Sequence, residues 1–142
     1  MSPTLVFIDT SAFKAYYDEK DDFHQEARNW MNDIAKKKLV ISGFVTTDYI
    51  LDETITLVRL AHSHEKATEF AGAALASRIL RIVYIGEERF LVALELFRRR
   101  RDKLWSFTDC ASFCVMESIG IRSSFSFDAN FKEAGFTIMP GL

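Results

Sequence analysis

Apolar residues along the chain occur either in short continuous runs or at helical spacing. Residues 5–8 form a continuous run that is typical of a buried central strand, and further strands are expected at 39–41, 79–85, 124–127 and 136–138, with a turn at Ser42 and Gly43. Between these runs the spacing predicts helices at 13–17, 22–37, 47–61, 65–77 and 87–101, and one that begins after Ser106. Strands that alternate with helices imply an α/β fold, with a mostly parallel sheet and helices on both faces. A chain of 142 residues is expected to form one domain, 1–142.

The helix after Ser106 is the most informative element. Ser106 and Asp109 have the spacing of a capping box, and the residues that follow are apolar nearly all round the helix. We therefore expect this helix to be buried. Asp109 falls between Phe113 and Met116, where a carboxylate must be neutralised, hydrogen-bonded or bound to a cation. A simple capping role for Asp109 is the alternative.

Three other acids stand at unusual positions. Asp9 follows the first strand and Asp128 follows the fourth, where open α/β sheets place their ligands. Each of the two is equally suited to cap a helix or a turn. Glu53 is predicted to lie within the apolar arc of its helix, near Leu57 and Leu60, where an acid is costly. A buried ion pair, or a place at the edge of the arc, is the alternative for Glu53.

If the first strand is central, these four acids meet in one crevice. Carboxylates that close repel one another, and a cation or raised pKa values must compensate. Oxygen ligands without His or Cys suit Mg²⁺ or Mn²⁺ rather than zinc. A cation of this kind binds phosphate oxygens, so we expect metal-assisted hydrolysis of a phosphodiester by an activated water. Thr10, Ser11 and Thr108 are placed to support the ligands with hydrogen bonds.

Four consecutive arginines, Arg98, Arg99, Arg100 and Arg101, end the helix at 87–101. Cations are favoured at a helix C-terminus, as in the run Lys36, Lys37 and Lys38, but four exceed what capping needs. Contact with a nucleic-acid backbone is therefore a second interpretation. The net charge of −2 does not by itself indicate a nucleic-acid binder, although acids bound to a metal would leave the remaining surface more basic.

Other features exclude some classes of protein. Cys110 and Cys114 are expected to be small core residues, since they form neither a disulfide framework nor a zinc site. The segment 62–64 has two histidines at a spacing that suits a helix–helix turn better than a metal pair. No apolar run has the length of a membrane span, and the N-terminus lacks the basic region of a signal peptide. A cytoplasmic location is the expectation.

Four segments together resemble PIN-domain ribonucleases, in particular the VapC-type toxins. They are residues 7–11, 48–54, 106–113 and 126–131, the last followed by 134–136, and they span essentially the whole chain. The resemblance implies a PIN-like three-layer sandwich with a five-stranded parallel sheet in the order 3-2-1-4-5. It implies a Mg²⁺- or Mn²⁺-dependent endoribonuclease with Asp9, Glu53, Asp109 and Asp128 around the metal. It also implies a homodimer and a cognate antitoxin protein that blocks the site.

Two other functions compete with that of an RNA-cleaving enzyme. A non-catalytic module would bind RNA or a protein partner through the same crevice and the arginine run, without turnover. In a phosphatase or phosphoacceptor domain, Asp9 would be the residue that becomes phosphorylated. That alternative is weaker, because Ser11 stands where a dehalogenase-type site needs a second Asp, and no Lys is clearly paired with the acids.

Overall fold

A five-stranded parallel sheet forms the centre of the computed structural model, which describes residues 4–37 and 40–141. Its order is β3-β2-β1-β4-β5, as the family resemblance implies. The strands are β1 (Thr4–Ile8), β2 (Ile41–Thr47), β3 (Leu80–Val83), β4 (Ser123–Phe125) and β5 (Thr137–Met139). Because parallel strands end at one edge of a sheet, the residues after β1 and β4 become neighbours. The Asp9 N–H accordingly donates to the carbonyl of Phe125 over 3.1 Å.

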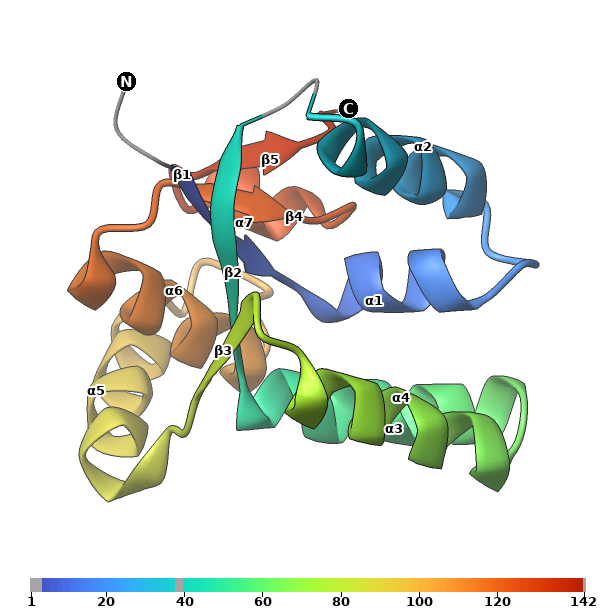
Figure 1. The fold of residues 1–142 in the computed structure, drawn as a ribbon. Coiled ribbons are helices and arrows are strands. Elements are labelled where there is room, and N and C mark those ends of the chain that lie inside the picture. The colour runs from blue at the N-terminus through green and yellow to red at the C-terminus, as the bar shows by residue number, and fades with distance from the viewer. Residues whose placement is uncertain (1–3, 38–39, 142) are drawn as a thin grey trace.

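Helices connect the strands and cover the sheet. They are α1 (Thr10–Tyr17), α2 (His24–Ala35), α3 (Asp48–Ala61), α4 (His64–Ala76), α5 (Gly86–Arg99), α6 (Phe107–Ile119) and α7 (Ala129–Glu133). Figure 1 shows α1 and α2 on one side of the sheet and α5 and α6 on the other, while α3 and α4 extend from the end of β2. The alternation of strands and helices is the one predicted from the apolar pattern.

The core covers both faces of β1, and the helix α6 packs on one of them. Val6 and Phe7 of β1 are fully buried, as expected for a central strand with helices on both faces. The Phe131 ring of α7 lies 6.1 Å from the Phe7 ring and 4.9 Å from the Phe113 ring of α6. The prediction of a buried helix after Ser106 is confirmed. Cys110 is buried and Cys114 half-buried, and both thiols are free.

The second strand differs from the prediction. Leu39 and Lys38 lie outside the described residues, and β2 runs through Ser42 and Gly43, where a turn was expected. Thr4 pairs with Ile41 but Leu5 pairs with Gly43, so Ser42 is an extra residue in a bulge. A Cβ on Gly43 would stand 3.4 Å from the Ile79 carbonyl oxygen and 3.5 Å from a Leu5 methyl group. These are ordinary contact distances, so Gly43 lies within an extended strand beside the bulge and does not mark a change of chain direction.

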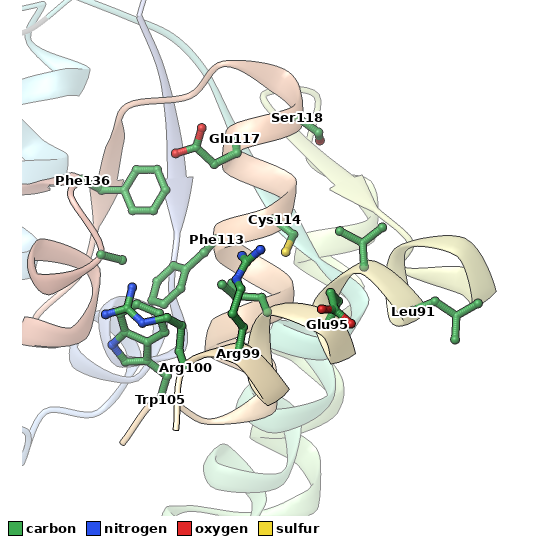
Figure 2. Close-up of a pocket in the computed structure, with 13 residues that line it drawn as sticks. Leu91, Glu95, Arg99, Arg100, Trp105, Phe113, Cys114, Glu117, Ser118 and Phe136 are labelled. Atoms are coloured by element: carbon green, nitrogen blue, oxygen red, sulfur yellow. The ribbon is translucent and has the colours of Figure 1, made fainter. Parts of the chain in front are cut away.

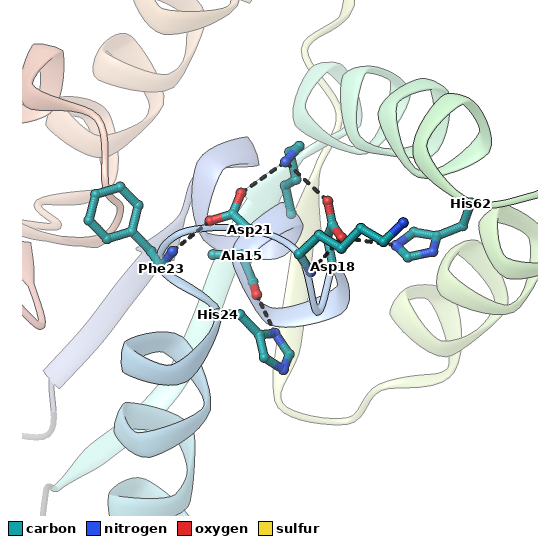
Figure 3. A network of polar contacts seen from close by, with 8 residues as sticks. Ala15, Asp18, Asp21, Phe23, His24 and His62 are labelled. Carbon is teal, nitrogen blue, oxygen red and sulfur yellow. Dashed lines mark hydrogen bonds and ion pairs between the residues drawn. The ribbon is translucent and has the colours of Figure 1, made fainter.

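Polar contacts join the α1–α2 corner to the α3–α4 turn (Figure 3). The Lys14 Nζ lies 3.3 Å from Asp18 Oδ2 and 2.9 Å from Asp21 Oδ2. His62 Nε2 lies 3.4 Å from Asp18 Oδ1. Ser63 caps α4 by accepting from the Lys66 N–H over 3.1 Å, which confirms the predicted helix–helix turn.

No helix in the described ranges is both long and apolar enough to cross a membrane.

Candidate metal-binding and active site

Three aspartates gather at the edge of the sheet where β1 and β4 end. Asp9 follows β1, Asp128 lies between β4 and α7, and Asp109 stands in the first turn of α6. Each also caps a helix, as the alternative interpretation predicted. Asp9 accepts from the Ser11 N–H over 3.4 Å, and Asp128 accepts from the Asn130 N–H over 2.9 Å.

The capping box at the start of α6 is confirmed. The Ser106 hydroxyl accepts from the Asp109 N–H, and Asp109 Oδ2 accepts from the Ser106 N–H, each over 3.0 Å. This reciprocal pair holds the Asp109 carboxylate in the first turn of a buried helix.

Two serine hydroxyls hold Asp9, which is only 4% exposed. Asp9 Oδ2 accepts from Ser11 Oγ over 2.8 Å and from Ser126 Oγ over 3.0 Å. Each hydroxyl in turn accepts a hydrogen bond from a backbone N–H. The Ser11 hydroxyl accepts from Phe127 over 2.9 Å, and the Ser126 hydroxyl accepts from Asp128 over 3.0 Å. The prediction that Ser11 supports the site is consistent with this contact. Ser126 was not identified from the sequence.

Asn130 links the other two aspartates. Its side-chain amide donates to Asp109 Oδ2 over 3.1 Å, and its backbone N–H donates to Asp128. Asn130 was expected only as part of a turn or short helix. Its position two residues after Asp128, in the first turn of the helix that follows β4, is the signal that identifies it in retrospect.

The electrostatics of the cluster are those of crowded carboxylates. The pKa of Asp9 is raised to about 7, mainly by burial and in smaller part by the Asp109 and Asp128 carboxylates, while hydrogen bonds from Ser11 and Ser126 oppose the rise. Burial also raises the pKa of Asp109, and Asp128 adds to that effect. The cluster therefore favours either a bound proton or a bound cation.

The predicted burial of Glu53 is wrong. Its side chain is exposed, and the inward position on α3 is taken by its neighbour Thr54. Thr54 Oγ1 donates to the Ile50 carbonyl over 2.7 Å, so this polar residue is satisfied within the core. Leu60, which defined the predicted arc, is 78% exposed.

Glu53 instead lines an open groove beside the aspartates. The groove has a volume of about 500 Å³ and is bounded by α3, α5 and the start of α6, with Tyr49, Asp52, Glu53, Thr56, Leu57, Phe90, Phe107 and Thr108 on its walls. Thr108 directly precedes Asp109, so the groove adjoins the carboxylate cluster. The hydroxyl of Thr10 has no hydrogen-bond partner within the described residues and gives Asp9 no support through that atom.

The carboxylate oxygens of the three aspartates are the type of ligand that a hard divalent cation prefers. Hydrogen bonds of the described residues occupy one oxygen of each aspartate, namely Asp9 Oδ2, Asp109 Oδ2 and Asp128 Oδ1, and leave the second oxygen without a hydrogen bond. Lys and Arg side chains in the described ranges form no ion pair with these aspartates. As arranged, however, no three His, Cys, Asp or Glu side chains among residues 4–37 and 40–141 form a group that could hold an ion.

The arginine run is not uniform. Arg100 donates to both oxygens of Asp102 over 3.0 and 3.1 Å, and its guanidinium lies 5.0 Å from the centre of the Trp105 ring. Arg98, Arg99 and Arg101 are exposed. Only these three therefore offer charges that are not already paired with Asp102.

A second cavity does not contain the carboxylates. It measures about 770 Å³ and lies between α5 and α6, where Figure 2 shows Arg99 and Arg100 beside Trp105 and Phe113. None of the four predicted acidic site residues lines it.

Comparison with known proteins gives one consistent result. The family model described as PIN domain matches residues 6–137. The chain is 32% identical to the 23S rRNA-specific endonuclease VapC20 of Mycobacterium tuberculosis, over 93% of this chain and 95% of that protein. It is also 32% identical to a VapC ribonuclease of Archaeoglobus fulgidus, over 88% of this chain and 78% of that protein.

Solved structures agree with this result. The crystal structure of the Mycobacterium tuberculosis VapC20, described as a sarcin-ricin loop cleaving toxin, has a TM-score of 0.82 at 30% identity and covers 93% of this chain and 96% of that one. VapBC2 from Rickettsia felis, crystallised with a promoter DNA fragment, has a TM-score of 0.67 at 12% identity and covers 95% of this chain and 97% of that one. At that identity the second likeness concerns the fold alone.

Proposed function

Because the chain belongs to the PIN-domain family, we propose that it is a metal-dependent endoribonuclease and the toxin of a toxin–antitoxin pair. The observation that supports this proposal is the cluster of Asp9, Asp109 and Asp128 at one edge of the sheet. Each has an oxygen that forms no hydrogen bond with residues 4–37 and 40–141. The relatives named as an endonuclease and a ribonuclease support the reaction class. RNA phosphodiester bonds are the proposed substrate.

Mg²⁺ or Mn²⁺ is the proposed cofactor. Asp9, Asp109 and Asp128 would hold it through carboxylate oxygens, and Glu53 would contribute from the wall of the groove. When bound, the cation supplies positive charge that polarises the scissile phosphate and acidifies the attacking water.

The remaining residues of the site position these acids. Ser11 and Ser126 fix the orientation of Asp9 through two hydroxyl donors, and Asn130 fixes Asp109 relative to Asp128. The exposed Arg98, Arg99 and Arg101 attract the RNA backbone, whereas Arg100 is engaged with Asp102.

Two protein partners complete the proposal. A cognate antitoxin would cover the site, and a second copy of the chain would form a homodimer. Both are implied by the resemblance to VapC-type toxins, and the relative described as a toxin supports the antitoxin.

A second candidate function is a non-catalytic module that binds RNA or a protein partner. It is favoured by the finding that no three potential ligands of the described residues are assembled around a common point. It predicts RNA binding that weakens with salt, without turnover.

Cleavage of total RNA by the purified, antitoxin-free protein tests the proposal. We expect cleavage in Mn²⁺ and none in excess chelator. Asp9→Asn and Asp109→Asn should lower the rate by more than the roughly hundredfold that loss of an outer-shell partner costs. Asp102→Asn is the matched control and should cut normally, because that acid is paired with Arg100 away from the cluster. Undiminished cleavage by Asp109→Asn would contradict the proposal, and binding without any cleavage would favour the second function.

A further inference from the structure

The groove beside the carboxylates has aromatic walls. The Phe107 ring lies 5.1 Å from the Phe90 ring, 5.9 Å from the Phe97 ring and 6.3 Å from the Tyr49 ring, measured between centroids. Phe90 is 40% exposed, and Tyr49 and Phe107 are half-buried. Aromatic rings that remain open to solvent in a groove offer a surface on which a flat ligand can stack.

The polar groups of the groove accept hydrogen bonds and carry negative charge. Asp52 and Glu53 are exposed on α3, and no Lys or Arg is found among the described residues that line the groove. A phosphate placed there would be repelled. The amino edge of a nucleobase would be attracted instead, because its N–H groups donate hydrogen bonds to carboxylates.

The groove also lies next to the first turn of α6, which carries Asp109. Thr108 lines it and is the residue before Asp109, so an RNA strand whose phosphate lies at the aspartates has a neighbouring base within reach of these walls. Proteins that recognise single-stranded RNA commonly stack splayed bases on aromatic side chains. The volume of about 500 Å³ lies in the range of pockets that bind small ligands.

On these grounds, and resting on the proposed function, we propose that this groove is the base-recognition subsite of the nuclease. One unpaired base next to the scissile phosphate stacks against Phe90, Tyr49 and Phe107. Its exocyclic amino group donates to Asp52. The groove therefore selects bases that carry an amino group on the edge facing α3.

Fluorescence quenching of 2-aminopurine measures this stacking without any cleavage. The probe is an oligouridylate with one central 2-aminopurine, bound to the full-length Asp9→Asn protein. We expect quenching on binding, and an affinity about fivefold to a hundredfold weaker when Phe90→Ala is added, since stacking on one aromatic ring contributes on that scale. Leu91→Ala is the matched control, because Leu91 is exposed on the same helix but does not line the groove.

A second pair of probes tests the role of Asp52. Asp52→Ala should weaken binding of the 2-aminopurine strand but leave unchanged the binding of a strand with unsubstituted purine, which lacks the amino group. Equal losses for both probes would overturn the assignment of Asp52.

The outcomes separate this inference from the proposed function. Absence of quenching, or quenching that Phe90→Ala leaves intact, overturns the subsite even if the wild-type protein cuts RNA in Mn²⁺. Loss of a dimer in Phe90→Ala, measured by light scattering, also overturns it, because the groove is then a seam between copies. Quenching that behaves as expected in a protein that never cuts RNA supports base binding while the nuclease proposal fails.

Discussion

At the scale of single residues, Asp9 is a carboxyl group whose ionisation the fold strongly disfavours. It is almost fully buried, it has two other aspartates nearby, and burial raises its pKa to about 7. In the unfolded chain the same carboxyl has an ordinary pKa near 3.8. The folded protein therefore binds a proton on Asp9 over a pH range in which the unfolded chain has released it.

This difference predicts how stability changes with pH in the absence of a cation. Between about pH 4 and pH 7 the folded state holds more protons on Asp9 than the unfolded state, so the free energy of unfolding falls as pH rises. Relative to Asp9→Asn, the wild-type protein should lose up to about 4 kcal/mol over this range. Urea unfolding in chelator at a series of pH values measures the loss. Parallel profiles for the two proteins would show that Asp9 does not titrate as described.

Ser126 provides a second prediction at this scale. Ser126→Ala removes a donor to Asp9 and leaves the Asp128 N–H without its acceptor. We expect cleavage to fall by about 10- to 100-fold, since the acids lose their orientation. Single-turnover cleavage rates in Mn²⁺ measure this effect.

Ser124→Ala is the matched control for that substitution. Ser124 is equally buried two residues earlier, but its hydroxyl has no hydrogen-bond partner within the described residues. Its replacement should leave cleavage unchanged. Equal losses in the two variants would mean that small changes in this strand, rather than the hydroxyl of Ser126, reduce activity.

At the scale of elements, local spacing predicted the helix starts well. The capping box of Ser106 and Asp109 and the acid after β1 depend on residues close in sequence, and the structure confirms these caps. The partners of Asp9 and Asp109 were harder to predict. Ser126 is 117 residues from Asp9, so their contact depends on the pairing of β1 with β4 rather than on any local pattern.

The errors at this scale also have physical causes. On α3 a threonine satisfied by its own helix enters the core, which turns Glu53 outward, and a helical wheel that treats threonine as polar cannot anticipate that exchange. In β2 the pair Ser42 and Gly43 resembles a turn signal, but it lies at a bulge within a strand that pairs with β1. In both places the tertiary packing overrides the local pattern.

The end of α5 yields a prediction for RNA affinity. Arg100 is paired with Asp102, whereas Arg98, Arg99 and Arg101 are exposed. Replacing the three exposed arginines by Gln should reduce the slope of log affinity against log salt by about 0.7 for each RNA phosphate that an arginine no longer neutralises. Arg100→Gln should leave the slope unchanged. Fluorescence anisotropy with a short labelled RNA on the Asp9→Asn protein measures both, and equal slopes in all variants would exclude the arginine run from the RNA interface.

At the scale of the whole molecule, the proposed cation should act on the stability of the entire fold. The three aspartates belong to elements at the centre of the sheet, and α6 and α7 pack through Phe113 and Phe131 onto Phe7 of β1. A ligand that binds only the folded chain stabilises it by about 2.7 kcal/mol at a hundred times its dissociation constant. Thermal unfolding should therefore shift upward with Mn²⁺ in the wild type and in Asp102→Asn, but not in Asp9→Asn. A shift of equal size in Asp9→Asn would place the ion elsewhere.

The two serines that hold Asp9 donate to the same oxygen atom, Oδ2. An acidic hydrogen on this carboxyl is therefore expected on Oδ1, the atom that would bind the proposed divalent ion. Loading that ion below neutrality would then expel the hydrogen into the solvent, and the heat of loading would depend on the ionisation enthalpy of the buffer. Calorimetric titrations in two buffers of the same pH would count the hydrogens released, and such an exchange would make ion loading sensitive to acidity at a single atom.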